Sequence, residues 1–232
     1  MGIEYNPVVD MNGLVYWYDT GNIRSYSGSG SAISSLPNGS VMNLYNGYST
    51  SGSGATLAIT LNGTNAYTLT ATNLYSQFPT SSTSMFIWAY SSAAGNIVSE
   101  LGQTTINTGW HDSNIEINSS GVVSMSVWHG SLTNRVTSSA ISFNTWYQLG
   151  WTYNGTTFTG YINGLSIGTT TFTRSRNGSE NYYTIGAPDS TNMGTNSYWN
   201  GRFSNFSVYN RSLTAAEVLK NYNSTKKRYG FS

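Results

Sequence analysis

The carboxylates are the side chains through which this chain could carry out acid–base chemistry. Glycoside hydrolysis requires one carboxyl as the acid and a second as the nucleophile or base. No two carboxylates occupy alternate positions of one predicted strand, and Asp112 and Glu116 are separated by a predicted bend. We therefore expect no catalytic pair and no enzymatic activity. The acidic residues are Glu4, Asp10, Asp19, Glu100, Asp112, Glu116, Glu180, Asp189 and Glu217.

The two histidines each follow a tryptophan, as Trp110-His111 and Trp128-His129. An aromatic ring beside an imidazole can form a platform for a sugar, and His111 with Asp112 could also contribute to a metal site. The alternative is two histidines at loop ends beside partly buried tryptophans, which we favour. These four residues are nevertheless the candidate ligand-binding residues of the sequence.

Calcium binding requires six to eight oxygen ligands, usually from several carboxylates and loop carbonyls. Asp112 and Asp189 are isolated in the sequence, and Asp19 is expected to hold a turn. No clear carboxylate cluster is therefore predicted. We assign no metal site and no cofactor, and calcium remains open.

The composition excludes several classes of protein. Among 232 residues there is no cysteine, and only 8% are charged, with a formal net charge of +1. A nearly neutral surface offers little attraction to nucleic acid or to acidic membranes. No stretch approaches the roughly 20 apolar residues of a membrane span, and the start of the chain has no signal-peptide pattern. We predict neither nucleic acid nor membrane as a partner.

Short apolar runs separated by Asn-Gly pairs predict the fold. Asn-Gly suits the tight turn between paired antiparallel strands, and many short strands at regular spacing are typical of a sandwich. The fold class is therefore all-β, a two-sheet antiparallel jelly-roll sandwich. Trp88 and Trp146 are expected to fill the space between the sheets with Trp151, whereas the positions of Trp17, Trp110, Trp128 and Trp199 are left open. The clearest strands are predicted at residues 14–18, 56–61, 85–90, 122–128, 135–143, 146–153, 156–162 and 203–209.

One short helix is predicted near the end of the chain, at residues 214–225. Thr214 and Glu217 form a capping box, in which each side chain bonds the other residue's backbone amide. Leu213 and Val218 occupy the positions of a hydrophobic staple, and Leu219 and Tyr222 extend the apolar stripe. The helix is expected to fray at the basic run of residues 226–228, where cations suit its negative end.

Three segments in order resemble the laminin-G-like, concanavalin A-like lectin/glucanase domains found in structural proteins of tailed phages. The resemblance spans nearly the whole chain. It implies this sandwich fold, and it is less specific for function because one fold hosts many sites. The segments are residues 13–19 with 25–30; residues 144–148, 153–155 and 161–164; and residues 185–186, 200–203, 209–214 and 221–223.

We divide the chain into an N-terminal arm, residues 1–12, and a single domain, residues 13–232. The arm lies outside the strand pattern but carries the apolar residues Ile3, Tyr5, Pro7, Val8 and Val9. Burying a few such side chains could offset the cost of ordering a short segment. We therefore expect the arm to dock on a partner, either a sister subunit or a shell protein. The alternative is that it packs on its own sheet as an edge strand.

The resemblance and the composition favour a non-enzymatic virion protein of a tailed phage, displayed on the capsid, tail or fibre and located in the virion. Its expected partners are other virion proteins or further copies of itself. The second hypothesis is a lectin-like module for host-surface glycans, which the surplus of aromatic residues supports. A glycoside hydrolase is a distant third.

Overall fold

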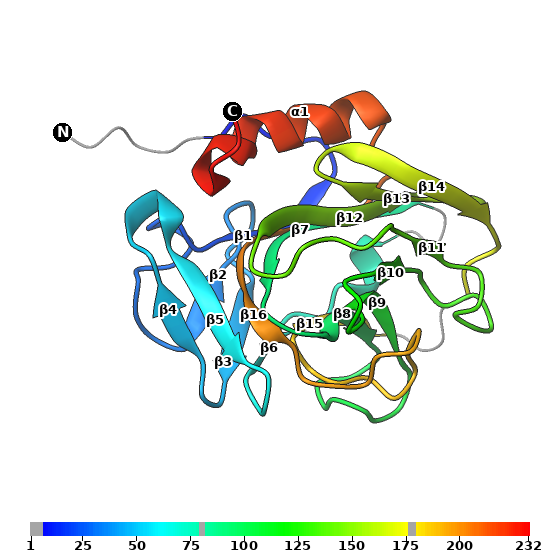
Figure 1. Cartoon of the computed structure of the whole chain (residues 1–232), viewed down its shortest axis with the longest axis horizontal. Helices are drawn as coiled ribbons and strands as arrows, with labels where there is room; N and C mark the ends of the chain where they lie inside the picture. The colour runs from blue at the N-terminus through cyan, green and yellow to red at the C-terminus, as the bar shows by residue number, and fades with distance from the viewer. Residues whose placement is uncertain (1–6, 79–81, 176–179) are drawn as a thin grey trace.

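The computed structural model describes residues 7–78, 82–175 and 180–232 as two antiparallel sheets packed face to face, with one α-helix on the outside (Figure 1). This confirms the predicted jelly-roll sandwich. None of the helices in these described ranges is long and apolar enough to span a bilayer.

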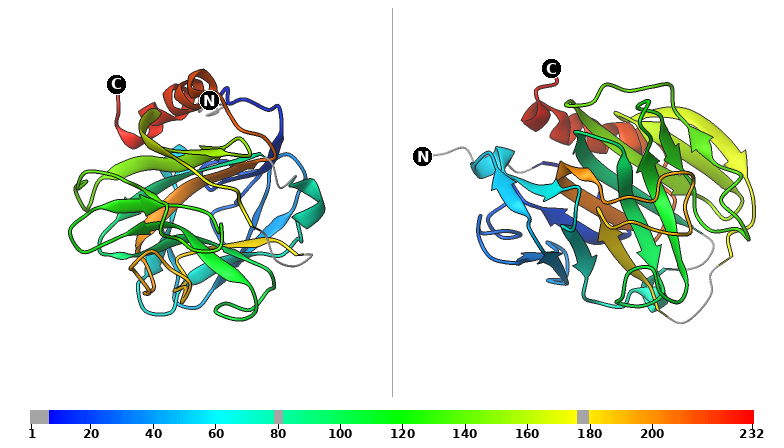
Figure 2. Two further views of the ribbon diagram at one scale, coloured as in Figure 1. Left: turned by 90° about the vertical axis from the view of Figure 1, so that its right-hand side faces the viewer. Right: turned by 60° about the horizontal axis from the view of Figure 1, so that its bottom comes forward.

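Sheet A forms one layer of the sandwich and carries the helix on its outer side (Figure 2). Its strand β1 (Leu14–Asp19) pairs with one end of β16, and β5 pairs with the other end, on either side of a bulge between Phe203 and Asn205. The spatial order is β14 (Leu165–Thr171), β13 (Thr157–Ile162), β12 (Trp146–Tyr153), β7 (Thr83–Ser91), β16 (Asn200–Tyr209), β5 (Ala58–Asn62) and β4 (Ser49–Ser51).

Sheet B forms the second layer. Short 3₁₀ turns, η1 (Gly54–Thr56) and η2 (Tyr75–Gln77), lie in the connections between strands. Its spatial order is β11 (Val136–Thr137), β10 (Val123–Met125), β9 (His111–Ile117), β8 (Gly95–Leu101), β15 (Tyr182–Ile185), β6 (Tyr67–Thr70), β3 (Val41–Tyr45) and β2 (Ala32–Ser34).

Local sequence explains several of these elements. Asn163 and Gly164 both adopt positive φ, at 51° and 78°, and form the predicted tight turn between β13 and β14. Val123, Met125 and Val127 all lie in the core between the sheets, as their alternation predicts. The strand predicted at residues 135–143 is wrong in extent, since only Val136 and Thr137 pair with β10.

The helix α1 (Ala215–Thr225) begins as predicted. Thr214 Oγ1 accepts from the Glu217 amide at 3.3 Å, and the Glu217 carboxylate accepts from the Thr214 amide at 2.7 Å. Leu213 and Val218 are buried in one apolar cluster on the outer side of sheet A. Leu219 is exposed, so the predicted apolar stripe is narrower than expected. The basic run continues as a 3₁₀ turn, η3 (Lys226–Tyr229), rather than fraying.

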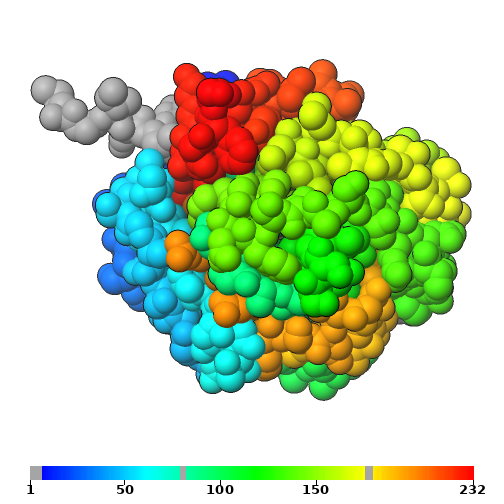
Figure 3. Space-filling view, in the orientation of Figure 1, coloured from blue at the N-terminus to red at the C-terminus, as the bar shows by residue number. Residues whose placement is uncertain are grey.

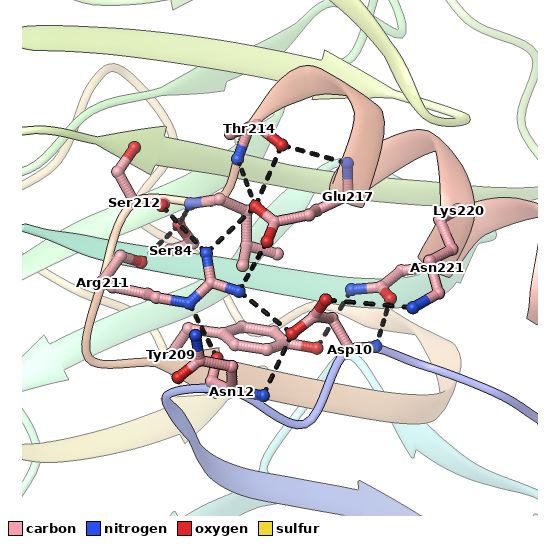
Figure 4. Close-up of polar contacts among 11 residues, drawn as sticks. Asp10, Asn12, Ser84, Tyr209, Arg211, Ser212, Thr214, Glu217, Lys220 and Asn221 are labelled. Atoms are coloured by element: carbon pink, nitrogen blue, oxygen red, sulfur yellow. Dashed lines mark hydrogen bonds and ion pairs between the residues drawn. The ribbon is translucent and has the colours of Figure 1, made fainter.

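The described part of the arm packs against this helix (Figure 4). The Asp10 amide donates to Asn221 Oδ1 at 2.7 Å, and Asp10 Oδ1 pairs with Arg211 Nη2 at 3.0 Å. Val9 packs on the apolar cluster around Leu213 and Val218. Residues 7–12 therefore return to their own domain, but through side chains and turns rather than as an edge strand. Ile3 and Tyr5 lie outside the described residues.

Candidate functional site

The four sequence-predicted site residues lie at the ends of two neighbouring strands. Trp110 precedes β9, which begins at His111, and Trp128 and His129 follow β10. His111 Nδ1 lies 2.7 Å from Asp189 Oδ1, whereas the His129 ring stacks on Phe172 at 4.2 Å. Among the described residues, no hydrogen bond, ion pair or ring contact joins the two Trp-His pairs. The structure thus gives each histidine a separate structural contact, and their role in ligand binding stays a prediction.

The carboxylates are closer together than the sequence analysis expects. Asp112 and Glu116 lie in the single strand β9, so the predicted bend between them is wrong. Glu100 on β8 lies directly opposite Asp112 in the register of the two strands. Sequence reasoning missed β8 and β9 because these strands carry Ser, Asn, Asp and Glu without a clear apolar alternation.

Glu100 belongs to a buried polar network at this end of the sandwich. It accepts from Arg174 Nη2 and from Asn181 Nδ2, and Arg174 Nη1 donates to Thr83 Oγ1 at 3.1 Å. Asp112 Oδ2 accepts from Asn114 Nδ2 at 3.0 Å. Burial and the charge of Glu100 raise the pKa of Asp112 well above its ordinary range, against the opposing charge of Arg174. The network is enclosed, because Glu100, Asp112 and Arg174 are all buried.

Glu116 is held in place from several directions. Its carboxylate accepts from the backbone amides of Met193 at 2.6 Å and Thr195 at 2.9 Å, and from Ser113 Oγ. Burial raises the pKa of Glu116, and these hydrogen bonds only partly oppose the shift. A groove of about 190 Å³ runs past it, with Arg135 on its wall. Glu116 lines this groove, and its carboxylate oxygens already accept the three hydrogen bonds described above.

The described residues hold no group of three or more His, Cys, Asp or Glu side chains arranged to bind a metal ion. The turn predicted at Asp19 is confirmed, because the Asp19 carboxylate accepts from the Gly21 amide at 3.0 Å. The same carboxylate pairs with Arg228 of η3.

The tryptophans show a second candidate site, on the outer side of sheet A. The expectation that Trp88 and Trp146 fill the space between the sheets is wrong for both residues. The Trp88 ring lies on the outer side, stacked on Tyr229 at 3.9 Å and Tyr222 at 5.7 Å, and the Trp146 ring also contacts Tyr229, at 5.0 Å. Its indole Nε1 donates to Thr225 Oγ1 at 3.0 Å. Trp151 and Trp199 belong to the core between the sheets. An apolar run indicates burial but not which side of a sheet each ring faces.

Two residues along the strand, Tyr90 lies on the same outer side as Trp88. Its cross-strand neighbours are Trp146 on β12 and Arg202 on β16. The rings of Tyr90 and Trp146 meet edge-on at 5.6 Å, and the Arg202 guanidinium lies 4.7 Å from the Tyr90 centroid. All three side chains are half-buried. We call this row of Trp146, Tyr90 and Arg202 the aromatic face.

Hydroxyl and amide side chains continue the aromatic face across the sheet. Arg202 pairs in register with Thr60 of β5, which pairs with Ser49 of β4. Two residues before Arg202 on β16, Asn200 pairs with Asn62, and both are exposed. In Figure 3 orange atoms of the β16 region reach the surface between cyan and green ones, below the red C-terminal segment. The arrangement offers ring faces for stacking beside short hydrogen-bonding groups, which suits a sugar.

Comparison with known proteins identifies the family. Residues 60–219 match the sequence profile of the concanavalin A-like lectin/glucanases superfamily. The chain belongs to this superfamily. No curated protein sequence matches it.

Solved structures with a similar fold come from sialidases and toxins. Trypanosoma rangeli sialidase gives a TM-score of 0.68 at 14% identity, over 96% of this chain and 34% of the sialidase. The binding domain of botulinum neurotoxin DC, in complex with SialylT, gives 0.66 at 14% identity, over 92% of this chain and 52% of that one. The binding domain of Paraclostridial Mosquitocidal Protein 1 gives 0.63 at 20% identity, over 91% and 52%. This superfamily member thus spans about a third to a half of these chains, and the likeness shows the fold alone.

Proposed function

We propose that this superfamily member is a non-catalytic glycan-binding module, and that the aromatic face is its binding surface. The observation that carries the proposal is the pair of half-buried rings, Trp146 and Tyr90, on the outer side of sheet A, in one row with Arg202, Thr60 and Ser49. The botulinum domain in complex with SialylT supports glycan binding as a use of this architecture. The buried, hydrogen-bonded carboxylates of β8 and β9 support a binding role over catalysis.

The test is glycan binding by the purified chain and by Trp146→Ala. Removing the indole should weaken binding about tenfold or more, since truncating a central aromatic contact costs more than about 1.4 kcal/mol. Tyr67→Ala is the matched control, because Tyr67 stacks on Tyr45 at 4.9 Å on the outer side of sheet B. Equal loss of affinity in both variants, or loss only in Tyr67→Ala, would contradict the proposal.

We further propose that the module is displayed on the virion of a tailed phage, with its arm directed toward a sister subunit or a shell protein. Support comes from the phage-type sequence segments and from two apolar arm residues, since Val8 is 70% and Met11 57% exposed. Both line a groove of about 390 Å³ with Trp17 and Leu36. Replacing Val8 and Met11 with Ser should lower occupancy on the particle without changing glycan binding. Unchanged occupancy would contradict this second proposal.

A further inference from the structure

Arg202 is a cation without an acidic partner among the described residues. Its guanidinium stacks over Tyr90, and no hydrogen bond or ion pair within the described parts of the chain engages its N–H groups. Arg202 is half-buried as a residue, but its nitrogens are not among the buried side-chain atoms that lack a partner, so its N–H groups stay accessible. Held over Tyr90 between β7 and β5, the guanidinium is therefore available to an acidic ligand.

The acids in the described parts of the chain have other neighbours, and Glu180 lies beside Tyr182. Asp10 and Glu217 pair with Arg211, Asp19 pairs with Arg228, and Glu100 pairs with Arg174. Asp112, Glu116 and Asp189 are buried in or near sheet B. A second cation on this side of sheet A is Lys226 of η3, which lies over Tyr222, and Tyr222 stacks on Trp88. Near the aromatic face, the outer side of the sheet thus carries the cations Arg202 and Lys226.

The stacked geometry leaves Arg202 able to bind a carboxylate. A guanidinium over a ring keeps its N–H donors in its own plane, and two of them match the two oxygens of a carboxylate. Trp146 lies on the far side of Tyr90, two strand spacings or about 10 Å from the Arg202 strand. A saccharide of two or three residues can cover both positions.

We propose that the aromatic face selects saccharides that carry a carboxylate, such as sialic or uronic acids. The carboxylate accepts from the Arg202 guanidinium, while a neighbouring sugar ring stacks on Trp146. A neutral sugar makes only the second contact and leaves Arg202 unpaired. The inference rests on the proposed glycan-binding function and adds its ligand class.

The test is calorimetry with 3′-sialyllactose, a hyaluronan tetrasaccharide and lactose. At least one acidic probe should bind the wild-type chain about tenfold or more tightly than lactose, the gain typical of a charge-assisted pair. Arg202→Gln should remove that advantage and leave lactose binding unchanged, and Arg202→Lys should restore part of it. Raising the salt to about 1 M should weaken only the acidic probe. The two acidic probes distinguish sialate from uronate as the source of the carboxylate.

Arg24→Gln is the control, since Arg24 is an exposed cation that lines a different groove. Equal affinity for lactose and both acidic probes would overturn the inference and leave the glycan-binding function intact. Equal losses in Arg202→Gln and Arg24→Gln would also overturn it, because they would show attraction by overall charge. Failure to bind any of the three probes would overturn the proposed function and the inference together.

Discussion

At the scale of single residues, the surroundings of the carboxylates move their pKa values in opposite directions. Hydrogen bonds from Arg211 and from the Thr214 amide and hydroxyl lower the pKa of Glu217 to about 2. Burial raises the pKa of Asp112, Glu116 and Asp189. Glu217 therefore stabilises the fold as an anion, whereas the buried acids favour it when protonated.

Glu217→Gln should lower the free energy of unfolding by about 1–2 kcal/mol at pH 7, from the lost capping box and ion pair. A lowered pKa gives stability that is present above the unfolded value of about 4.5 and is lost as pH falls through about 2. The difference from wild type should thus be largest at neutral pH and shrink toward pH 2. Urea denaturation at both pH values measures it. An equal difference at both would contradict this account.

In Asp112→Asn, the free energy of unfolding should fall less steeply than in the wild type as the pH rises from 4 to 8. A raised pKa gives stability that is present below the ordinary value of 3.8 and is lost as pH rises through the folded value. The wild-type free energy of unfolding should therefore fall as pH rises above about 4, more steeply than in the variant. Glu116 and Asp189 remain in the variant, so part of the slope should persist. Identical slopes in urea titrations from pH 4 to 8 would refute this role of Asp112.

At the scale of elements, local chemistry predicts some structures and misses others. Thr214 and Glu217 locate the helix because capping depends on neighbouring residues alone. The strands β8 and β9 escape prediction because Asp112 and Glu116 gain their partners from distant segments, such as Met193 and Arg174. The aromatic face was missed for a related reason. Pairing of Trp146, Tyr90 and Arg202 depends on strand order, which periodicity does not specify.

Deleting residues 1–10 should destabilise the domain. The truncation removes the Asp10 contacts with Arg211 and Asn221, buried Pro7 and the packing of Val9 on the outer apolar cluster. A loss of about 2 kcal/mol follows from one buried aliphatic side chain and a partly exposed ion pair. A chain that starts at Pro7 retains these contacts and serves as the control. Thermal melting should separate the two, and equal melting temperatures would show that the arm contributes nothing to the fold.

At the scale of the whole molecule, the C-terminal elements, the arm and the aromatic face occupy different parts of the outer side of sheet A. The helix, η3 and residues 7–12 cover one part of the outer side of sheet A, and the aromatic face adjoins them where the Trp146 ring contacts Tyr229 of η3 at 5.0 Å. The sequence was sufficient to predict the two-sheet architecture and its family. It placed the candidate ligand site at Trp110, His111, Trp128 and His129. In the fold, His111 contacts Asp189 and His129 stacks on Phe172.

The purified chain should not hydrolyse β-glucans or sialyllactose. Its carboxylates on β8 and β9 are engaged by Arg174, Asn114 and backbone amides, so no pair is available as acid and nucleophile. Product release measured over long incubations, with Glu116→Gln as the paired variant, examines this directly. Turnover by wild type that disappears in the variant would establish catalysis instead.

The central claim is that glycans bind on the aromatic face of sheet A. The most direct measurement is the set of indole N–H signals in ¹⁵N-labelled protein, followed by NMR as 3′-sialyllactose is added. The account predicts that the signal of half-buried Trp146 shifts with saturation, while those of Trp110 and Trp128 stay in place. Shifts centred on Trp110 and Trp128, with Trp146 unchanged, would contradict the account and return the site to the ends of β9 and β10.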